Sequence, residues 1–229
     1  MENPKAQADI VSAVLIVMIA IGLTATAFAW GLPLIQKRQD TVVLERVSSY
    51  FDQGNANSLP SRIEFVANNG GDQTFALDTN GFWLLRACPT GEISSCNPQP
   101  GTDVTKENNS IEFTFFSKVS KIAAGAGYVS LTPGSSCPPS SGIVGKDKSS
   151  VVCAKSVSRH DGFEITYRIW FRQVSDAASD RGFKIDLTKH ESGVYNFTGK
   201  VVKMSRQNIN QILVGGKTLI IPEIKILLE

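Results

Sequence analysis

Hydrophobic residues fill one long stretch near the start of the chain. Residues 10–35 (IVSAVLIVMIAIGLTATAFAWGLPLI) contain no charged side chain. As a continuous helix this stretch would be roughly 39 Å long, which exceeds the ~30 Å hydrocarbon core of a bilayer. A helix that is apolar on every face is buried in lipid or against other helices. The stretch therefore predicts a helix that crosses a membrane or packs against copies of itself.

The pattern becomes amphipathic after the apolar stretch, over residues 36–53. Charged residues there lie mostly off one apolar stripe. The stripe has four members at helical spacing: Val43, Val47, Tyr50 and Phe51. We expect the helix to continue through this segment and to place the stripe against a following domain. Gly54 is the expected stop of this helix.

Beyond the helix, apolar and polar residues alternate, which is typical of half-buried strands. The clearest case is FEITYRIWF at residues 163–171. An Asn-Asn-Gly-Gly turn at residues 68–71 predicts an opening hairpin between residues 61–67 and 74–77. Strands separated by Gly, Pro and Asn turns favour a sandwich. The predicted fold class is α+β: a long N-terminal hydrophobic α-helix followed by an antiparallel, Ig-like β-sandwich over residues 61–229.

One large aromatic residue, Trp170, falls on the polar face of the strand predicted at residues 163–171. This position has two interpretations. The tryptophan either marks a contact between subunits, or it is covered by a loop or by the amphipathic part of the helix. The sequence leaves both interpretations open.

Composition and charge limit the number of domains and the class of partner. The 229 residues, of which 42% are hydrophobic and 19% charged, suffice for one apolar helix and one globular domain. The net charge is +2, and Lys and Arg are scattered along the chain. The basic surface of a nucleic-acid-binding protein is therefore missing, and no nucleic-acid partner is expected.

The cysteines indicate an oxidising compartment. All four lie in polar loops beyond the helix: Cys88, Cys96, Cys137 and Cys153. An even number in such loops predicts two disulfides in an extracytoplasmic domain. Three connectivities are open, and pairing of nearest neighbours is favoured because each bond would close one loop. A zinc site is the alternative, but it lacks C-x-x-C spacing, so no metal is expected. Glycosylation sequons at Asn108 and Asn196 agree with this compartment.

Catalytic motifs are not recognisable in the sequence. His160 and His190 lack a nearby nucleophile motif or an array of metal ligands. The Gly-rich segment at residues 125–127 precedes a predicted strand, whereas a phosphate-binding loop would precede a helix. We therefore expect neither an enzyme nor a cofactor.

The first residues carry a pattern typical of a processed leader. Residues 1–6 are polar and end in Lys5-Ala6, directly before Gln7 and the apolar stretch. This arrangement resembles the prepilins of the archaeal type IV pilus and archaellum superfamily, whose class III signal peptide precedes the hydrophobic segment. The resemblance implies that a prepilin peptidase cuts between Ala6 and Gln7. It also identifies residues 7–54 as the N-terminal pilin helix.

Small residues within the apolar stretch suggest how such helices would meet. Gly22 and Thr26 are four residues apart, as are Ala25 and Ala29. This small-xxx-small spacing lets apolar helices approach closely. In an assembled filament these four residues would form a packing seam.

The resemblance implies a structural subunit of an extracellular filament. Residues 10–35 would hold the prepilin in the cell membrane until the pilus assembly machinery adds it to a homopolymer, whose non-closing contacts propagate helically. The filament would serve adhesion or surface attachment. Two alternatives stay open. One is a single-pass, membrane-anchored extracellular β-sandwich that binds a ligand, and the other is a secreted protein whose signal peptide ends before Trp30.

Overall fold

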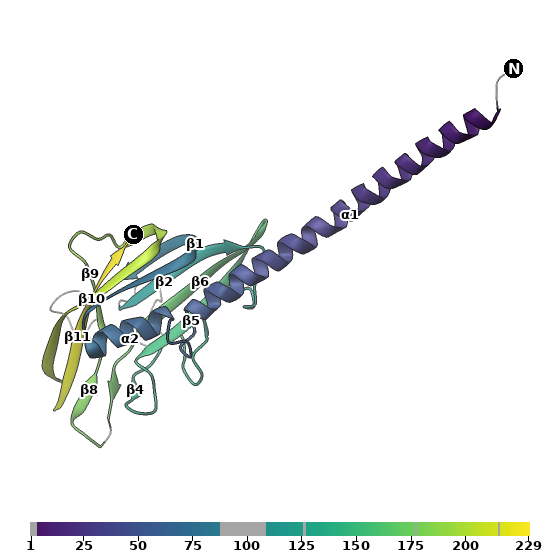
Figure 1. Ribbon diagram of the computed structural model, residues 1–229. Coiled ribbons are helices and arrows are strands. Elements are labelled where there is room, and N and C mark those ends of the chain that lie inside the picture. The colour runs from purple at the N-terminus through teal and green to yellow at the C-terminus, as the bar shows by residue number, and fades with distance from the viewer. Residues whose placement is uncertain (1–3, 88–108, 126, 177, 215) are drawn as a thin grey trace. The chain divides into compact units, whose positions relative to one another are not determined.

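The chain contains one long apolar helix and one strand-rich domain. The computed structural model describes residues 4–87, 109–125, 127–176, 178–214 and 216–229. These residues form two compact units, Met1–Val42 and Val43–Glu229. Helix α1, Pro4–Tyr50, has residues in both units. The second unit also contains helix α2, Leu59–Asn69, and all the described strands (Figure 1). The fold class is therefore α+β.

The strands hydrogen-bond into one 11-stranded sheet with the order β3-β5-β6-β2-β1-β10-β11-β8-β7-β4, and β9 pairs with β11. Most neighbours are antiparallel, but β8 and β9 run parallel to β11, and β4 runs parallel to β7. An Ig-like sandwich of two separate sheets is not confirmed. The strand bounds are β1 Asp72–Arg86, β2 Ser110–Ser117, β3 Val129–Ser130, β4 Gly142–Ile143, β5 Ser150–Arg159, β6 Gly162–Phe171, β7 Val174–Ser175, β8 Arg181–Phe183, β9 Asp186–Lys189, β10 Asn196–Val214 and β11 Lys217–Leu228.

Helix α2 replaces the strand expected at residues 61–67, so the predicted hairpin is wrong, whereas the strand expected at residues 74–77 is confirmed as part of β1. Ser58 caps the helix, since its side chain accepts a bond from the Ser61 amide, and Pro60 occupies the first turn. Gly70 ends α2 with φ 79°, and the Gly70 N–H donates a hydrogen bond to the Val66 carbonyl at 2.8 Å. The Asn-Asn-Gly-Gly segment therefore ends a helix. The buried residues follow helical spacing: Leu59, Pro60, Ile63, Val66 and Ala67.

The amphipathic end of α1 contributes to the core of the strand-rich unit. Leu44, Val47 and Phe51 are each 1% exposed, whereas Val43 is 38% exposed. The buried stripe thus contains Leu44 in place of the predicted Val43. The helix ends at Tyr50, before the expected stop at residue 54. Burial of this stripe places the last turn of α1, together with α2, in one hydrophobic cluster with the sheet.

Phe51 lies at the centre of an aromatic cluster in this core. Its ring stacks on that of Tyr167 in β6, with centroids 4.8 Å apart. The centroids of Phe113 and Trp83 lie 6.0 and 6.4 Å from that of Phe51. These residues come from the chain segment after α1 and from β1, β2 and β6, so the cluster holds the end of the helix against the middle of the sheet.

Asn109 links three segments at another edge of the core. It is fully buried and adopts φ 63°, a conformation that asparagine tolerates better than most residues. Its side-chain amide donates to the carbonyls of Phe171 and Ile185 at 2.8 and 2.7 Å. Its side-chain oxygen accepts from the Leu187 amide at 2.8 Å. The position needs both the N–H donors and the oxygen acceptor of the asparagine amide. An ionised aspartate could accept from the Leu187 amide but could not donate to the two carbonyls.

Candidate functional site: the apolar surface of helix α1

The described side chains of the first unit expose an apolar helix surface. The segment Ser12–Tyr50 is the one helix among the described residues that is long and apolar enough to cross a membrane, and its most apolar window has a mean hydropathy of 2.3 with none of it buried. This helix could serve as a membrane anchor or as part of a signal sequence. The exposed large apolar residues are Val14, Leu15, Ile16, Val17, Met18, Ile19, Ile21, Leu23, Phe28, Trp30, Leu32, Leu34 and Ile35.

The four small residues expected to form a packing seam share one stripe of this surface. Gly22, Ala25, Thr26 and Ala29 are all exposed and have helical i, i+3, i+4, i+7 spacing. A Cβ atom added at Gly22 would meet no heavy atom within 4 Å. The backbone at Gly22 is therefore open to close approach by another helix.

The threonine hydroxyls of α1 are satisfied within the helix. Thr26 Oγ1 donates to the Gly22 carbonyl at 2.7 Å, and Thr24 Oγ1 donates to the Ala20 carbonyl at 2.8 Å. Such bonds to the preceding turn leave only methyl groups for outside contacts. The surface is consequently suited to lipid or to another apolar helix, although it contains hydroxyl residues.

The proposed leader is only partly described. Residues 1–3 lie outside the described residues, and α1 begins at Pro4. Lys5, Ala6 and Gln7 therefore belong to the first turns of the helical backbone. The boundary between leader and mature chain stays a prediction.

One of the two expected disulfides is present. Cys137 and Cys153 are bonded, as nearest-neighbour pairing predicts, whereas Cys88 and Cys96 lie outside the described residues. The bonded pair packs with Val151 and Trp170 in a second small cluster on the face of the sheet opposite the main core. Trp170 is fully buried there. The structure therefore favours a tryptophan that a loop covers.

Buried charges adjoin this second cluster. The Arg168 guanidinium lies 4.1 Å from the centroid of the Trp170 ring, and its Nε lies 3.1 Å from Glu112 Oε1. Arg86 Nε approaches the same carboxylate oxygen at 2.9 Å. Burial, followed by the charge of Glu112, raises the pKa of Tyr128 to about 12. The Glu112 carboxylate thus lies between two guanidinium groups, and Arg168 also contacts the ring of Tyr128, with 5.8 Å from its Cζ atom to the ring centroid.

The two sequons differ in their surroundings. Asn108 lies outside the described residues, but the next two residues, Asn109 and Ser110, are buried. Asn196 and Thr198 are both exposed at the start of β10. Of the two sequons, the one at Asn196 is accessible in the folded domain.

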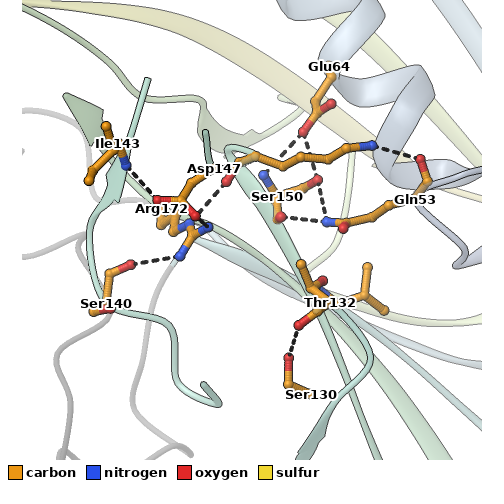
Figure 2. A network of polar contacts seen from close by, with 11 residues as sticks. Gln53, Glu64, Ser130, Thr132, Ser140, Ile143, Asp147, Ser150 and Arg172 are labelled. Carbon is orange, nitrogen blue, oxygen red and sulfur yellow. Dashed lines mark hydrogen bonds and ion pairs between the residues drawn. The ribbon is translucent and has the colours of Figure 1, made fainter. Parts of the chain in front are cut away.

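A polar network joins the chain after α1 to α2 and β5 (Figure 2). Glu64 Oε1 accepts bonds from the Ser149 hydroxyl at 2.8 Å and from the Ser150 hydroxyl at 2.7 Å. Gln53 Nε2 donates to Ser150 Oγ at 3.0 Å, and Lys148 Nζ donates to the Gln53 carbonyl at 2.9 Å. Glu64 thus joins α2 to the start of β5, and Ser150 and Lys148 join that segment to the chain after α1.

The network borders a cleft of about 630 Å³, which Gln53 and Lys148 help to line. Serine, threonine and carboxylate side chains lie along it beside Phe51 and Val152. Among the described residues, no group of three His, Cys, Asp or Glu side chains is placed to hold a metal ion. No local sequence pattern marks this cleft, Glu64 or Ser150, because the residues that meet there are distant in the chain.

Comparison with protein-family models, curated proteins and solved structures finds no match.

Proposed function

We propose that this chain is a structural subunit, a pilin, of an archaeal type IV pilus-like extracellular filament that polymerises through α1. The exposed apolar surface at residues 12–35 is the observation that carries the proposal. Before assembly, lipid would cover this surface. After removal of residues 1–6 by a prepilin peptidase and extraction by the assembly machinery, the α1 helices of neighbouring subunits would cover it instead. The strand-rich unit would form the outside of a filament that serves adhesion.

Packing, and not the hydrophobic effect, would drive this exchange. Lipid tails are about as apolar as neighbouring helices, so association in the membrane depends on close contact between backbones. The stripe formed by Gly22, Ala25, Thr26 and Ala29 permits that contact. The internally bonded hydroxyls of Thr24 and Thr26 would move from lipid to protein without losing a partner. A contact between two different surfaces of identical subunits propagates without closing, which gives a helical polymer.

A second candidate is a single-pass, membrane-anchored extracellular binding module. The polar cleft of about 630 Å³ in the strand-rich unit is the observation that favours it. In this case α1 would stay in the membrane, and the functional form would be a monomer that presents the cleft to a ligand.

The mass of the native N-terminal peptide separates these candidates. A mature chain that begins at Gln7 supports the filament. A chain that retains Met1 supports the anchored module, and one that begins at Trp30 identifies a secreted protein cut by a signal peptidase. Either of the last two results overturns the pilin proposal.

A matched pair of glycine variants tests the packing seam. Gly22→Leu fills the stripe, whereas Gly31→Leu adds the same side chain on the opposite side of the helix, since nine residues at about 100° each bring it half a turn away. Neither new Cβ would meet an atom of the chain within 4 Å. We expect Gly22→Leu to reduce filament yield in electron micrographs at least tenfold, and Gly31→Leu to reduce it much less. Equal yields would contradict the seam, provided that both variants reach the membrane at equal levels.

A further inference from the structure

An unpaired strand edge remains in the strand-rich unit. Strand β10 pairs with β1 through residues 196–205 and with β11 through residues 202–214. From residue 208 to residue 214, β10 has β11 on one side and no paired strand among the described residues on the other. The two ends of the sheet path, β3 and β4, are only 2 residues long each. The long free edge therefore lies on β10 and not at the ends of the sheet.

Residues 208–214 lack the charges and proline that usually prevent pairing, and the register shift between β10 and β11 lies just before them, between Arg206 and Asn208. Residues 207–214 read QNINQILV and contain no charge, proline or glycine. Proteins commonly protect an exposed edge with charged residues or proline. The flanking basic side chains are turned to other partners, since Arg206 Nη1 donates to the Ala67 carbonyl at 3.1 Å and Lys217 Nζ to the Asp176 carbonyl at 2.8 Å. No charge within residues 207–214 would repel a second strand.

We propose that residues 208–214 of β10 pair antiparallel with the same residues of a second copy of this chain, about a two-fold axis at Gln211. Another extended strand can match the backbone N–H and C=O groups of an exposed edge. Within this segment the Ile209 N–H donates to Asn208 Oδ1 at 2.8 Å, and pairing would replace any such side-chain bond on the free edge. Ile209, Gln211 and Leu213 share one face of the strand because side chains alternate. Ile209 is 45% exposed and Leu213 is 74% exposed. Centring the pair on Gln211 places each Ile209 opposite the Leu213 of the partner and the two Gln211 amides opposite each other.

The same register keeps positive charges apart. It places Arg206 opposite Gly216 and Lys217 opposite Ser205, so neither basic residue faces another. Two-fold symmetry makes this contact self-limiting, in contrast to the propagating contact proposed for α1. The inference does not rest on the proposed function, because two unassembled chains would pair in the same way. If both hold, β10 would link subunits of adjacent filaments.

Cysteine cross-linking of the full chain in detergent tests the register. Directly opposite residues in an antiparallel pair have Cβ atoms about 5 Å apart, so Gln211→Cys should cross-link to itself through a short bismaleimide. Gln207→Cys is the matched control on the same edge. In this register its two copies lie eight residues apart, about 26 Å. We expect at least tenfold more cross-linked dimer from Gln211→Cys than from Gln207→Cys or the unsubstituted chain. Equal yields, with both cysteines accessible to a monofunctional maleimide, would overturn the proposal.

A second pair of variants tests the contact itself. Gln211→Lys places two ammonium groups across the proposed axis, whereas Gln211→Thr keeps a neutral residue that favours strands. We expect the lysine variant to weaken dimerisation, measured by light scattering in detergent, at least tenfold relative to the threonine variant, with equal thermal stability of the monomers. A dimer that tolerates lysine would refute the edge contact. If the chain retains Met1 but still cross-links at residue 211, the pilin proposal is refuted and the β10 contact is supported.

Discussion

Phe51 offers the most direct test of how the end of α1 is held in the strand-rich unit. The side chain is 1% exposed and stacks on Tyr167 with ring centroids 4.8 Å apart. Replacement of a buried phenylalanine by alanine costs about 3–5 kcal/mol, which includes the cavity left behind. We expect Phe51→Ala to lower the free energy of unfolding by about 4 kcal/mol, since the ring also adjoins Trp83 and Phe113.

Urea unfolding of the full chain in detergent provides the assay. Trp83 is buried beside Phe51 and reports the transition by fluorescence. Trp30 is 77% exposed on α1, so a Trp30→Phe background removes its signal. With a slope of about 2 kcal/mol per molar urea, the midpoint of Phe51→Ala should fall by about 2 M. Val43→Ala is the matched control, and its effect should stay within about 0.5 kcal/mol because the side chain is partly exposed. A loss below about 1 kcal/mol for Phe51→Ala, or equal losses for both variants, would refute the assigned stripe.

Three other predictions concern polar groups of the strand-rich unit. Asn109→Asp should destabilise the fold by about 3 kcal/mol, more than Asn109→Gly in the same urea assay, because a carboxylate cannot donate to two carbonyls and glycine keeps the positive φ. Lys184 Nζ lies 2.8 Å from Asp186 Oδ1, although the angles do not suit a hydrogen bond, and both groups are buried. Lys184→Met should cost about 3 kcal/mol, and adding Asp186→Leu should recover most of it; a double variant as unstable as the single one would contradict this. The pKa of Tyr128 is raised from 10.0 to about 12, chiefly by burial. The unfolded chain therefore loses this proton first, so stability should fall between about pH 10 and 12, and Tyr128→Phe should reduce that fall in pH-dependent unfolding.

The sequence predicted those parts of the fold in which one local pattern dominates. Residues 10–35 are apolar throughout, so a helix there requires no information from distant contacts. The alternation at residues 163–171 identified the core face of β6, where Ile165, Tyr167, Ile169 and Phe171 are buried. The pairing of Cys137 with Cys153 followed from their proximity in the sequence.

Other parts depended on signals that compete or on distant partners. At residues 61–67 the alternation of apolar and polar residues indicated a strand. The helix signals on either side, the N-cap Ser58 and the C-terminal Gly70, outweigh that alternation and determine α2. Phe65, a member of that alternation, is 53% exposed on the helix. The burial of Trp170 depends on a loop that is distant in the sequence. The contact between Glu64 and Ser150 likewise joins residues that are distant in the sequence. The free edge of β10 became visible only once the pairing partners of each strand were known.

The order of the strands has a consequence for biosynthesis. Strand β1 lies between β2 and β10, and β10 lies between β1 and β11. During translation, β1 is made more than a hundred residues before its partner strand β10, because Asp72 pairs with Ser205. Long-range pairing of this kind is slow. The apolar helix therefore leaves the ribosome while the sheet is still incomplete, and the sheet can be completed only after β10 and β11 have been made.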